Sequence, residues 1–178
     1  MNKFILSVVF TLFTSVIFGQ IKWMTFTEAV EAQQKNPKKI MMDVYTEWCG
    51  PCKMLDKNTF QDKQVIDYVN KNFYAVKFDA ESGDEFTFKG KKYSNPGFVP
   101  GRTGRKSVHQ LTQAFGVSGY PTIIFLDESA NLIMPLVGYY NAQQIEIYLK
   151  LFGKDDYKKV DTKEKWEQYQ KEFKGEFN

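Results

Sequence analysis

Short apolar runs alternate with longer segments of mixed polarity along the first half of the chain. The short runs predict buried strands, and the mixed segments carry apolar side chains at mostly helical spacing. The expected elements are a helix over 26–36, a strand over 40–45, a helix from 51, a helix over 62–73 and a strand over 75–79. This alternation of helices and strands predicts parallel strands joined by helical crossovers.

The second half of the chain predicts a strand hairpin and three more helices. Two apolar runs around a polar turn indicate the hairpin, with strands over 121–126 and 132–137. The helices are expected after a capping box at 107–110, over 141–152, and from 161. The last helix carries Trp166, Tyr169 and Phe173 along one side, so we expect this apolar edge to dock on the body of the protein.

Residues 82–106 interrupt the regular pattern with many glycines and prolines. A small hairpin is expected within them over 86–93, turning at Lys89 and Gly90. We interpret this segment as an insertion with local order and not as a linker between domains.

Length and composition indicate one globular domain. The chain has 178 residues, of which 43% are apolar and 16% aromatic, enough for a single sizeable core. The formal charge of +3 is small for this length. Nucleic-acid binders usually carry a much stronger basic bias, so we expect no nucleic-acid partner.

Residues 1–19 have the pattern of a signal peptide. Lys3 precedes an unbroken run of apolar residues with Ser and Thr that ends at Phe18, and Gly19 is a small residue suited to cleavage. An uncleaved membrane anchor is the alternative, but a spanning helix needs ~20 apolar residues, and this run is shorter. No cysteine lies near the expected cleavage site, which argues against a lipid anchor on the mature protein. We therefore expect an exported protein without a stable membrane anchor, in the periplasm or else secreted.

Cys49 and Cys52 are the only cysteines, and they allow three kinds of site. A structural zinc site needs four ligands, and the chain offers one histidine besides the pair, so we expect no metal. That histidine, His109, is expected on the surface without a catalytic role. A purely structural disulfide here would stabilise little, because the loop it closes is short.

Thiol–disulfide exchange suits the motif best. At a helix N-terminus, free backbone N–H groups and the helix dipole favour the thiolate of Cys49, which lowers its pKa from ~8.5 to ~3.5–7.5. Cys52 lies one turn into the helix, where it can attack a mixed disulfide. Gly50 and Pro51 form the tight turn between the sulfurs, and Trp48 shields one side.

The sequence Trp-Cys-Gly-Pro-Cys-Lys at 48–53, directly after a predicted strand, resembles the active site of the thioredoxin family. The similarity extends over about 40–152. The family places a buried acid before the nucleophile, a lysine on the next strand, a cis-proline at the start of the strand facing the disulfide, and a glycine after the last strand. The matching residues here are Asp43, Lys77, Pro121 and Gly138.

The resemblance implies a thioredoxin-like three-layer α/β sandwich, with a central mixed sheet flanked by helices. The domain would cover 20–153, with the insertion before the helix that precedes the cis-proline, and 154–178 would be a C-terminal helical extension. In such a site Asp43, tuned by Lys77, accepts the proton of Cys52. The substrate groove would be formed by Tyr120, Pro121 and Gly138.

The implied activity is that of an exported protein thiol:disulfide oxidoreductase without a cofactor. Gly-Pro between the cysteines resembles reducing members of the family, which indicates reduction of disulfides in cell-envelope proteins. Its partners would be protein disulfides and a membrane-embedded dithiol that supplies electrons. A disulfide oxidase or isomerase, or a non-catalytic binding module with the same fold, stays open as an alternative.

The chain departs from the family pattern at the active-site helix and in the insertion. Residues 54–58 contain no proline, where the family usually has one that kinks the helix. The insertion follows a strand parallel to the one before Cys49, so it should emerge at the active-site end of the sheet. Its basic side chains lead to the hypothesis of a basic rim that selects an acidic protein partner, with a solvated loop as the alternative. These side chains are Lys89, Lys91, Lys92, Arg102, Arg105 and Lys106.

Overall fold

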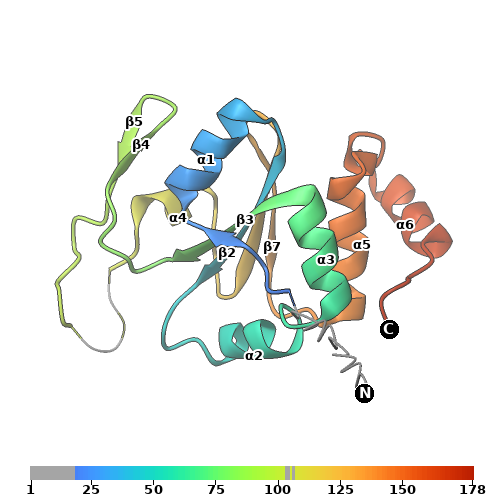
Figure 1. The fold of residues 1–178 in the computed structure, drawn as a ribbon, viewed down its shortest axis with the longest axis horizontal. Helices are drawn as coiled ribbons and strands as arrows, with labels where there is room; N and C mark the ends of the chain where they lie inside the picture. Colours follow the sequence, from blue (N-terminus) through green and yellow to red (C-terminus); the bar gives the residue numbers. More distant parts are fainter. Residues whose placement is uncertain (1–18, 103–104, 106) are drawn as a thin grey trace, which may run out of the picture.

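A central sheet separates two layers of helices in the computed structural model, which describes residues 19–102, 105 and 107–178 (Figure 1). This arrangement confirms the expected three-layer α/β sandwich. Residues 1–18 of the predicted signal peptide lie outside the described residues. Within the described part, no helix is long and apolar enough to cross a membrane.

The described sheet has five strands in the order β1-β3-β2-β6-β7 and is mixed, as expected. β1, β3 and β2 are parallel, whereas β6 and β7 form an antiparallel hairpin beside β2. The strands are β1 (Trp23–Met24), β2 (Lys39–Tyr45), β3 (Phe73–Asp79), β6 (Thr122–Leu126) and β7 (Leu132–Val137). β1 was not predicted, because a two-residue strand shows no alternation of polar and apolar positions.

Helices cover both faces of the sheet. α1 and α4 lie on one face, and α3 and α5 lie on the other, with α6 outside α5 (Figure 1). α2 follows β2 after a short loop, and the cysteine motif lies at its start. The bounds are α1 (Phe26–Lys35), α2 (Gly50–Asn58), α3 (Lys63–Asn72), α4 (Gln110–Ala114), α5 (Ala142–Gly153) and α6 (Lys163–Glu172), with a 3-10 turn η1 (Asp156–Lys158) before α6.

The core consists of two apolar clusters, one on each face of the sheet. Successive strand side chains point to opposite faces, so Ile123 and Phe125 enter one cluster while Ile124 and Leu126 enter the other. Both faces are buried, which explains why the central strands are almost continuously apolar. Phe125 is fully buried, and its ring centroid lies 4.3 Å from that of Phe152 on α5.

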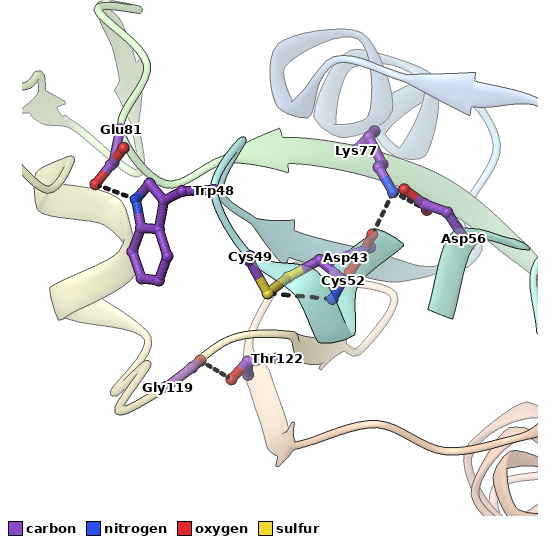
Figure 2. Close-up of a disulfide and its surroundings, with 9 residues drawn as sticks. All are labelled: Asp43, Trp48, Cys49, Cys52, Asp56, Lys77, Glu81, Gly119 and Thr122. Atoms are coloured by element: carbon purple, nitrogen blue, oxygen red, sulfur yellow. Dashed lines mark hydrogen bonds and ion pairs between the residues drawn. A yellow bond between two sulfur atoms is a disulfide. The ribbon is translucent and has the colours of Figure 1, made fainter. Parts of the chain in front are cut away.

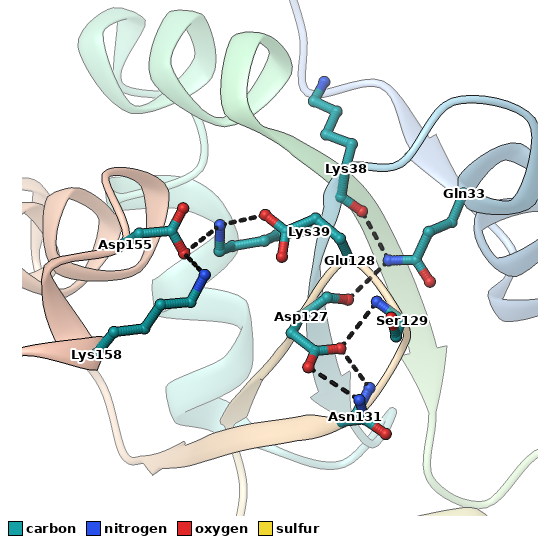
Figure 3. Close-up of polar contacts among 9 residues, drawn as sticks. All are labelled: Gln33, Lys38, Lys39, Asp127, Glu128, Ser129, Asn131, Asp155 and Lys158. Atoms are coloured by element: carbon teal, nitrogen blue, oxygen red, sulfur yellow. Dashed lines mark hydrogen bonds and ion pairs between the residues drawn. The ribbon is translucent and has the colours of Figure 1, made fainter.

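A polar network closes the end of the sheet opposite the cysteines (Figure 3). The buried Lys39, at the start of β2, pairs with Glu128 at 2.5 Å and Asp155 at 3.0 Å. Burial opposes the charge of Lys39, but the two carboxylates outweigh burial and raise its pKa. Gln33 on α1 donates to the backbone carbonyl of Asp127 at 2.8 Å. The β6–β7 turn is thereby attached to β2 and α1, and Lys39 also links β2 to the C-terminal extension.

The insertion contains the predicted hairpin, formed by β4 (Phe86–Phe88) and β5 (Lys91–Tyr93). The turn lies at Lys89 and Gly90, which both have positive φ. The hairpin packs on α1, where Phe88 contacts Phe26 edge-on at 5.0 Å between ring centroids. Lys89 donates to Asn131 in the β6–β7 turn at 2.6 Å. Lys89, at the turn of the hairpin, therefore lies at the end of the sheet away from the cysteines.

α4 starts later than predicted, and His109 is not a surface residue. The N-cap is His109 and not Ser107, because the His109 Nδ1 accepts from the backbone N–H of Leu111 at 3.0 Å. The Nε2 therefore carries the proton and donates to the carbonyl of Asp84 at 3.0 Å. The imidazole is fully buried and stacks on Phe86. A buried polar ring with both nitrogens satisfied attaches the insertion to the core.

The C-terminal extension packs on the domain, as expected for its apolar edge. Trp166 of α6 stacks on Tyr148 of α5 at 5.6 Å between ring centroids. Beyond α6, the buried Glu146 accepts from the backbone N–H groups of Glu176 at 2.7 Å and Phe177 at 3.0 Å. The Phe177 side chain enters the core cluster between sheet and α5.

Candidate active site

The two cysteines form a disulfide at the start of α2 (Figure 2). Cys49 is the N-cap of this helix, and its Sγ accepts from the backbone N–H of Cys52 at 3.1 Å. Pro51 occupies the first turn, where its missing N–H costs no helical hydrogen bond. In the reduced state the same N–H groups and helix dipole would stabilise a thiolate at Cys49. The predicted position of the pair at a helix N-terminus is confirmed.

Behind the disulfide, Asp43 is fully buried and forms an ion pair with Lys77. The two residues are opposite one another in the β2–β3 register, and the Asp43 Oδ2 lies 2.6 Å from the Lys77 Nζ. Burial raises the pKa of Asp43 to about 6, although the Lys77 charge acts in the opposite direction. The Asp43 Oδ1 accepts no hydrogen bond from the described residues. A carboxyl group with these properties can hold or release a proton near neutral pH.

Lys77 also contacts a second carboxylate, Asp56, which the sequence analysis missed. Asp56 lies four residues after Cys52 on α2, and this i,i+4 spacing was a usable signal because it places both side chains on one helix face. Burial opposes the charge of Lys77, but the two carboxylates raise its pKa. The negative charge of Asp56 contributes to the raised pKa of Asp43. In Figure 2 this acid–lysine–acid group lies on the side of the disulfide away from Trp48.

Trp48 is held by two further residues at the same edge of the sheet. Its Nε1–H donates to Glu81 at 3.0 Å, and its ring meets Tyr120 edge-on at 6.0 Å between centroids. Glu81 is buried and was not predicted as a site residue. Its position in the sequence could have indicated its role. Glu81 follows the end of β3, and Trp48 follows the end of the parallel strand β2, so both lie at one edge of the sheet.

The predicted groove residues come together at the start of β6. The Tyr120–Pro121 peptide is cis, as the family resemblance implied. The Pro121 carbonyl accepts from the N–H of Gly138 at 2.8 Å, and Gly138 has φ +107°, a conformation that favours glycine. Thr122 Oγ1 donates to the carbonyl of Gly119 at 2.7 Å, and Figure 2 shows this hydrogen bond below the disulfide.

The insertion reaches the active site, but a rim formed by all six basic side chains is wrong. The guanidinium of Arg105 lies 4.7 Å from the centre of the Trp48 ring. Lys89 contacts the far turn, and Lys92 pairs with Glu85 at 2.7 Å in the hairpin. The reason is topological, since the hairpin turns back over α1 before the chain returns to α4. Lys106 lies outside the described residues.

The described residues contain no group of three or more His, Cys, Asp or Glu side chains able to hold a metal ion. The charged groups behind the disulfide are Asp43 and Asp56, both paired with Lys77. This arrangement can support exchange between a dithiol and a disulfide.

Comparison with known proteins agrees with the fold. The family model of the thioredoxin-like domain matches residues 26–153. The chain is 26% identical over 124 residues to the thiol:disulfide interchange protein DsbD of Pectobacterium atrosepticum, an alignment that covers 68% of this chain and 18% of DsbD. The chain thus spans about a fifth or less of the length of the curated relatives it matches.

Two solved structures resemble the protein over most of its length. A thioredoxin-fold protein from Helicobacter pylori is 19% identical with a TM-score of 0.58, and the alignment covers 76% of this chain and 82% of the other. A protein from Bacteroides thetaiotaomicron, provisionally assigned as a disulphide-isomerase, is 30% identical with a TM-score of 0.54. That alignment covers 76% of this chain and 94% of the other.

Proposed function

The chain belongs to the thioredoxin-like domain family, and on this premise we propose that it is an exported protein thiol:disulfide oxidoreductase that reduces disulfides in cell-envelope proteins. The observation that carries the proposal is the Cys49–Cys52 disulfide at the start of α2 with the buried Asp43 behind it. The name of the DsbD relatives, thiol:disulfide interchange protein, supports the same chemistry.

The reaction begins with the reduced dithiol. The Cys49 thiolate attacks one sulfur of a substrate disulfide, which forms a mixed disulfide and releases the other substrate sulfur as a thiolate. Cys52 then loses its proton and attacks the Sγ of Cys49. The Cys49–Cys52 disulfide re-forms, and the second substrate sulfur leaves as a thiolate. Two electrons pass from the dithiol to the substrate.

Asp43 is the proposed acceptor of the Cys52 proton. Its pKa of about 6 is closer to that of a thiol than an ordinary carboxyl pKa is, which reduces the free-energy cost of the transfer. Lys77, on the neighbouring strand, would stabilise the carboxylate form of Asp43 through its ion pair. Tyr120, Pro121 and Gly138 would form the groove for an extended substrate strand, whose backbone could pair with the exposed chain there.

The compartment and partners follow from the signal-like sequence of 1–19 and from the direction of electron flow. An exported reductase needs electrons outside the cytosol, so we propose a membrane-embedded dithiol protein as the donor and the periplasm as the location. If no donor reduces the site, it would act as an oxidase or isomerase. The provisional disulphide-isomerase assignment of the Bacteroides thetaiotaomicron protein favours this second candidate.

Trapping with Cys52→Ser tests the exchange reaction, because without the resolving thiol a mixed disulfide at Cys49 persists. Envelope proteins should be captured by this variant and released by a reductant. The double variant Cys49→Ser/Cys52→Ser is the matched control, and it also tests the alternative of a binding module. The exchange reaction would be rejected if Cys52→Ser captured no protein. It would also be rejected if cells carrying the double variant behaved like cells carrying the wild-type protein, as expected for a binding module.

The redox state in cells separates the two directions of electron flow. Acid quenching followed by thiol alkylation reports the fraction of Cys49 and Cys52 that is reduced. A mainly reduced pair supports the reductase. A mainly disulfide-bonded pair would instead support the oxidase or isomerase.

A further inference from the structure

The part of the insertion that reaches the active site is a loop closed at its base. The buried Asn95 donates through Nδ2 to the carbonyl of Ser82 at 3.0 Å and to that of Ser107 at 2.8 Å. These two carbonyls lie on the segments that enter and leave the loop. One side chain therefore holds these two segments together.

Two large apolar side chains of this loop are exposed. Phe98 is 36% exposed and Val99 is 51% exposed. The Phe98 ring packs on Gly83, where a Cβ atom would lie only 2.4 Å from the ring, so this glycine leaves the space that the ring occupies. Gly83 lies two residues after Glu81, which accepts a hydrogen bond from the Trp48 indole. The exposed apolar surface of the loop is thereby attached next to the active-site tryptophan, which is itself 41% exposed.

The loop also carries two exposed arginines, Arg102 and Arg105. Arg105 lies over the face of Trp48 at 4.7 Å, and Arg102 belongs to the turn that starts at Val99. Guanidinium groups bind carboxylates through two parallel hydrogen bonds, so an exposed arginine beside an apolar surface favours an acidic ligand.

We propose that Trp48, Phe98, Val99, Arg102 and Arg105 form an outer wall of the substrate site. This wall binds the polypeptide next to its disulfide and selects segments that carry an acidic side chain beside an apolar one. The inference rests on the proposed exchange reaction and adds the substrate class to it. The occupant is a protein segment bound in continuity with the Cys49 site, because Arg105 and Cys49 flank the same tryptophan.

The arginines act mainly before and during encounter. Charges at an exposed site raise the association rate of oppositely charged partners, and salt weakens this effect because the screening length is only about 8–10 Å at ordinary ionic strength. The chemistry at sulfur is not altered. The wall should therefore change the reaction rates of peptide disulfides according to their flanking residues. It should not change the reaction rate of small neutral disulfides.

Matched peptides test this selectivity. Each peptide contains one internal disulfide, and the set differs only in two flanking residues, which are glutamates, glutamines or lysines. The reduced protein should react with the glutamate peptide roughly three- to tenfold faster than with the lysine peptide, and high salt should reduce this ratio. In Arg102→Gln/Arg105→Gln the ratio should fall to near one. Lys89→Gln/Lys91→Gln, on the hairpin, is the matched control and should keep the wild-type ratio.

The small neutral disulfide of hydroxyethanethiol separates failure of this inference from failure of the proposed function. No reaction of the wild-type protein with it would reject the exchange reaction itself. A normal reaction with it, together with equal rates for the three peptides or a ratio that the arginine variant leaves unchanged, would overturn the outer wall. Val99→Ser, at a half-exposed position, should slow peptides with an apolar flanking residue more than peptides with a serine there.

Discussion

The buried carboxyl group of Asp43 should make the stability of the oxidised protein depend on pH in a way that one substitution removes. Its pKa rises from 3.8 to about 6 on folding, because burial disfavours the carboxylate. Between these two values the folded state holds a proton that the unfolded state has already lost. The contribution of Asp43 to stability therefore falls as pH rises through this window and is lowest above the folded pKa.

The size of the effect follows from the pKa shift. A shift of about two pH units corresponds to about 3 kcal/mol, at ~1.4 kcal/mol per unit. Asp43→Asn imitates the protonated carboxyl, so its stability should match that of the wild type below about pH 4 and exceed it by about 3 kcal/mol above about pH 7. Lys77 keeps Asp56 as a partner in this variant.

Urea unfolding of the oxidised wild type and of oxidised Asp43→Asn across this pH range measures the difference in their free energies of unfolding. The titration of all other groups largely cancels in this difference. Asp56→Asn is the matched control. Asp56 is 44% exposed, and its charge raises the pKa of Asp43, so its removal should shift the pH dependence to lower pH without abolishing it. A difference between Asp43→Asn and the wild type that is constant with pH would refute the reasoning.

Three further substitutions or titrations test other parts of the structure. Glu146→Gln should destabilise the protein by about 1–3 kcal/mol in urea unfolding and speed hydrogen exchange at Phe177, because two backbone N–H groups lose a charged acceptor, while Lys150 keeps Glu176 as a partner. Phe125→Ala should cost about 3–5 kcal/mol, measured in the same way, since the ring is fully buried; little loss would contradict its central position. His109 has its pKa lowered by burial, so the unfolded chain takes up the proton first, and stability should fall as pH drops below 6.5. NMR of the ring nitrogens should show a midpoint below 6.5 and the proton on Nε2, and a midpoint at or above 6.5 would contradict the buried position.

Much of the fold could be predicted because its signals are local. The capping box of Thr25 with Glu28 and the hairpin turn at Lys89 and Gly90 depend on residues within a few positions of each other, and both are present. The start of α4 was predicted wrongly, because the capping box at 107–110 indicated Ser107 as N-cap, whereas the N-cap is His109. The histidine ring is buried against aromatic side chains of β3 and the insertion, and this packing could not be predicted from nearby residues.

The candidate site shows the same division. A dithiol at a helix start and a buried acid on the preceding strand could be predicted from motif and polarity. Asp56 and Glu81 were missed, because their roles depend on contacts with Lys77 and Trp48, which are distant in the sequence.

By itself, the sequence determined the order of helices and strands, the two-sided burial of the central strands, and the pair of cysteines at the start of a helix. These follow from periodicity, capping and turn preferences, which act over a few residues. Only the tertiary structure decided that Lys77 joins two carboxylates, that His109 is buried, and that Lys89 and Arg105 of the insertion lie at opposite ends of the sheet. The physical reason is that such contacts depend on how whole elements pack, and packing is set by the burial of both faces of the sheet and not by any short stretch of the chain.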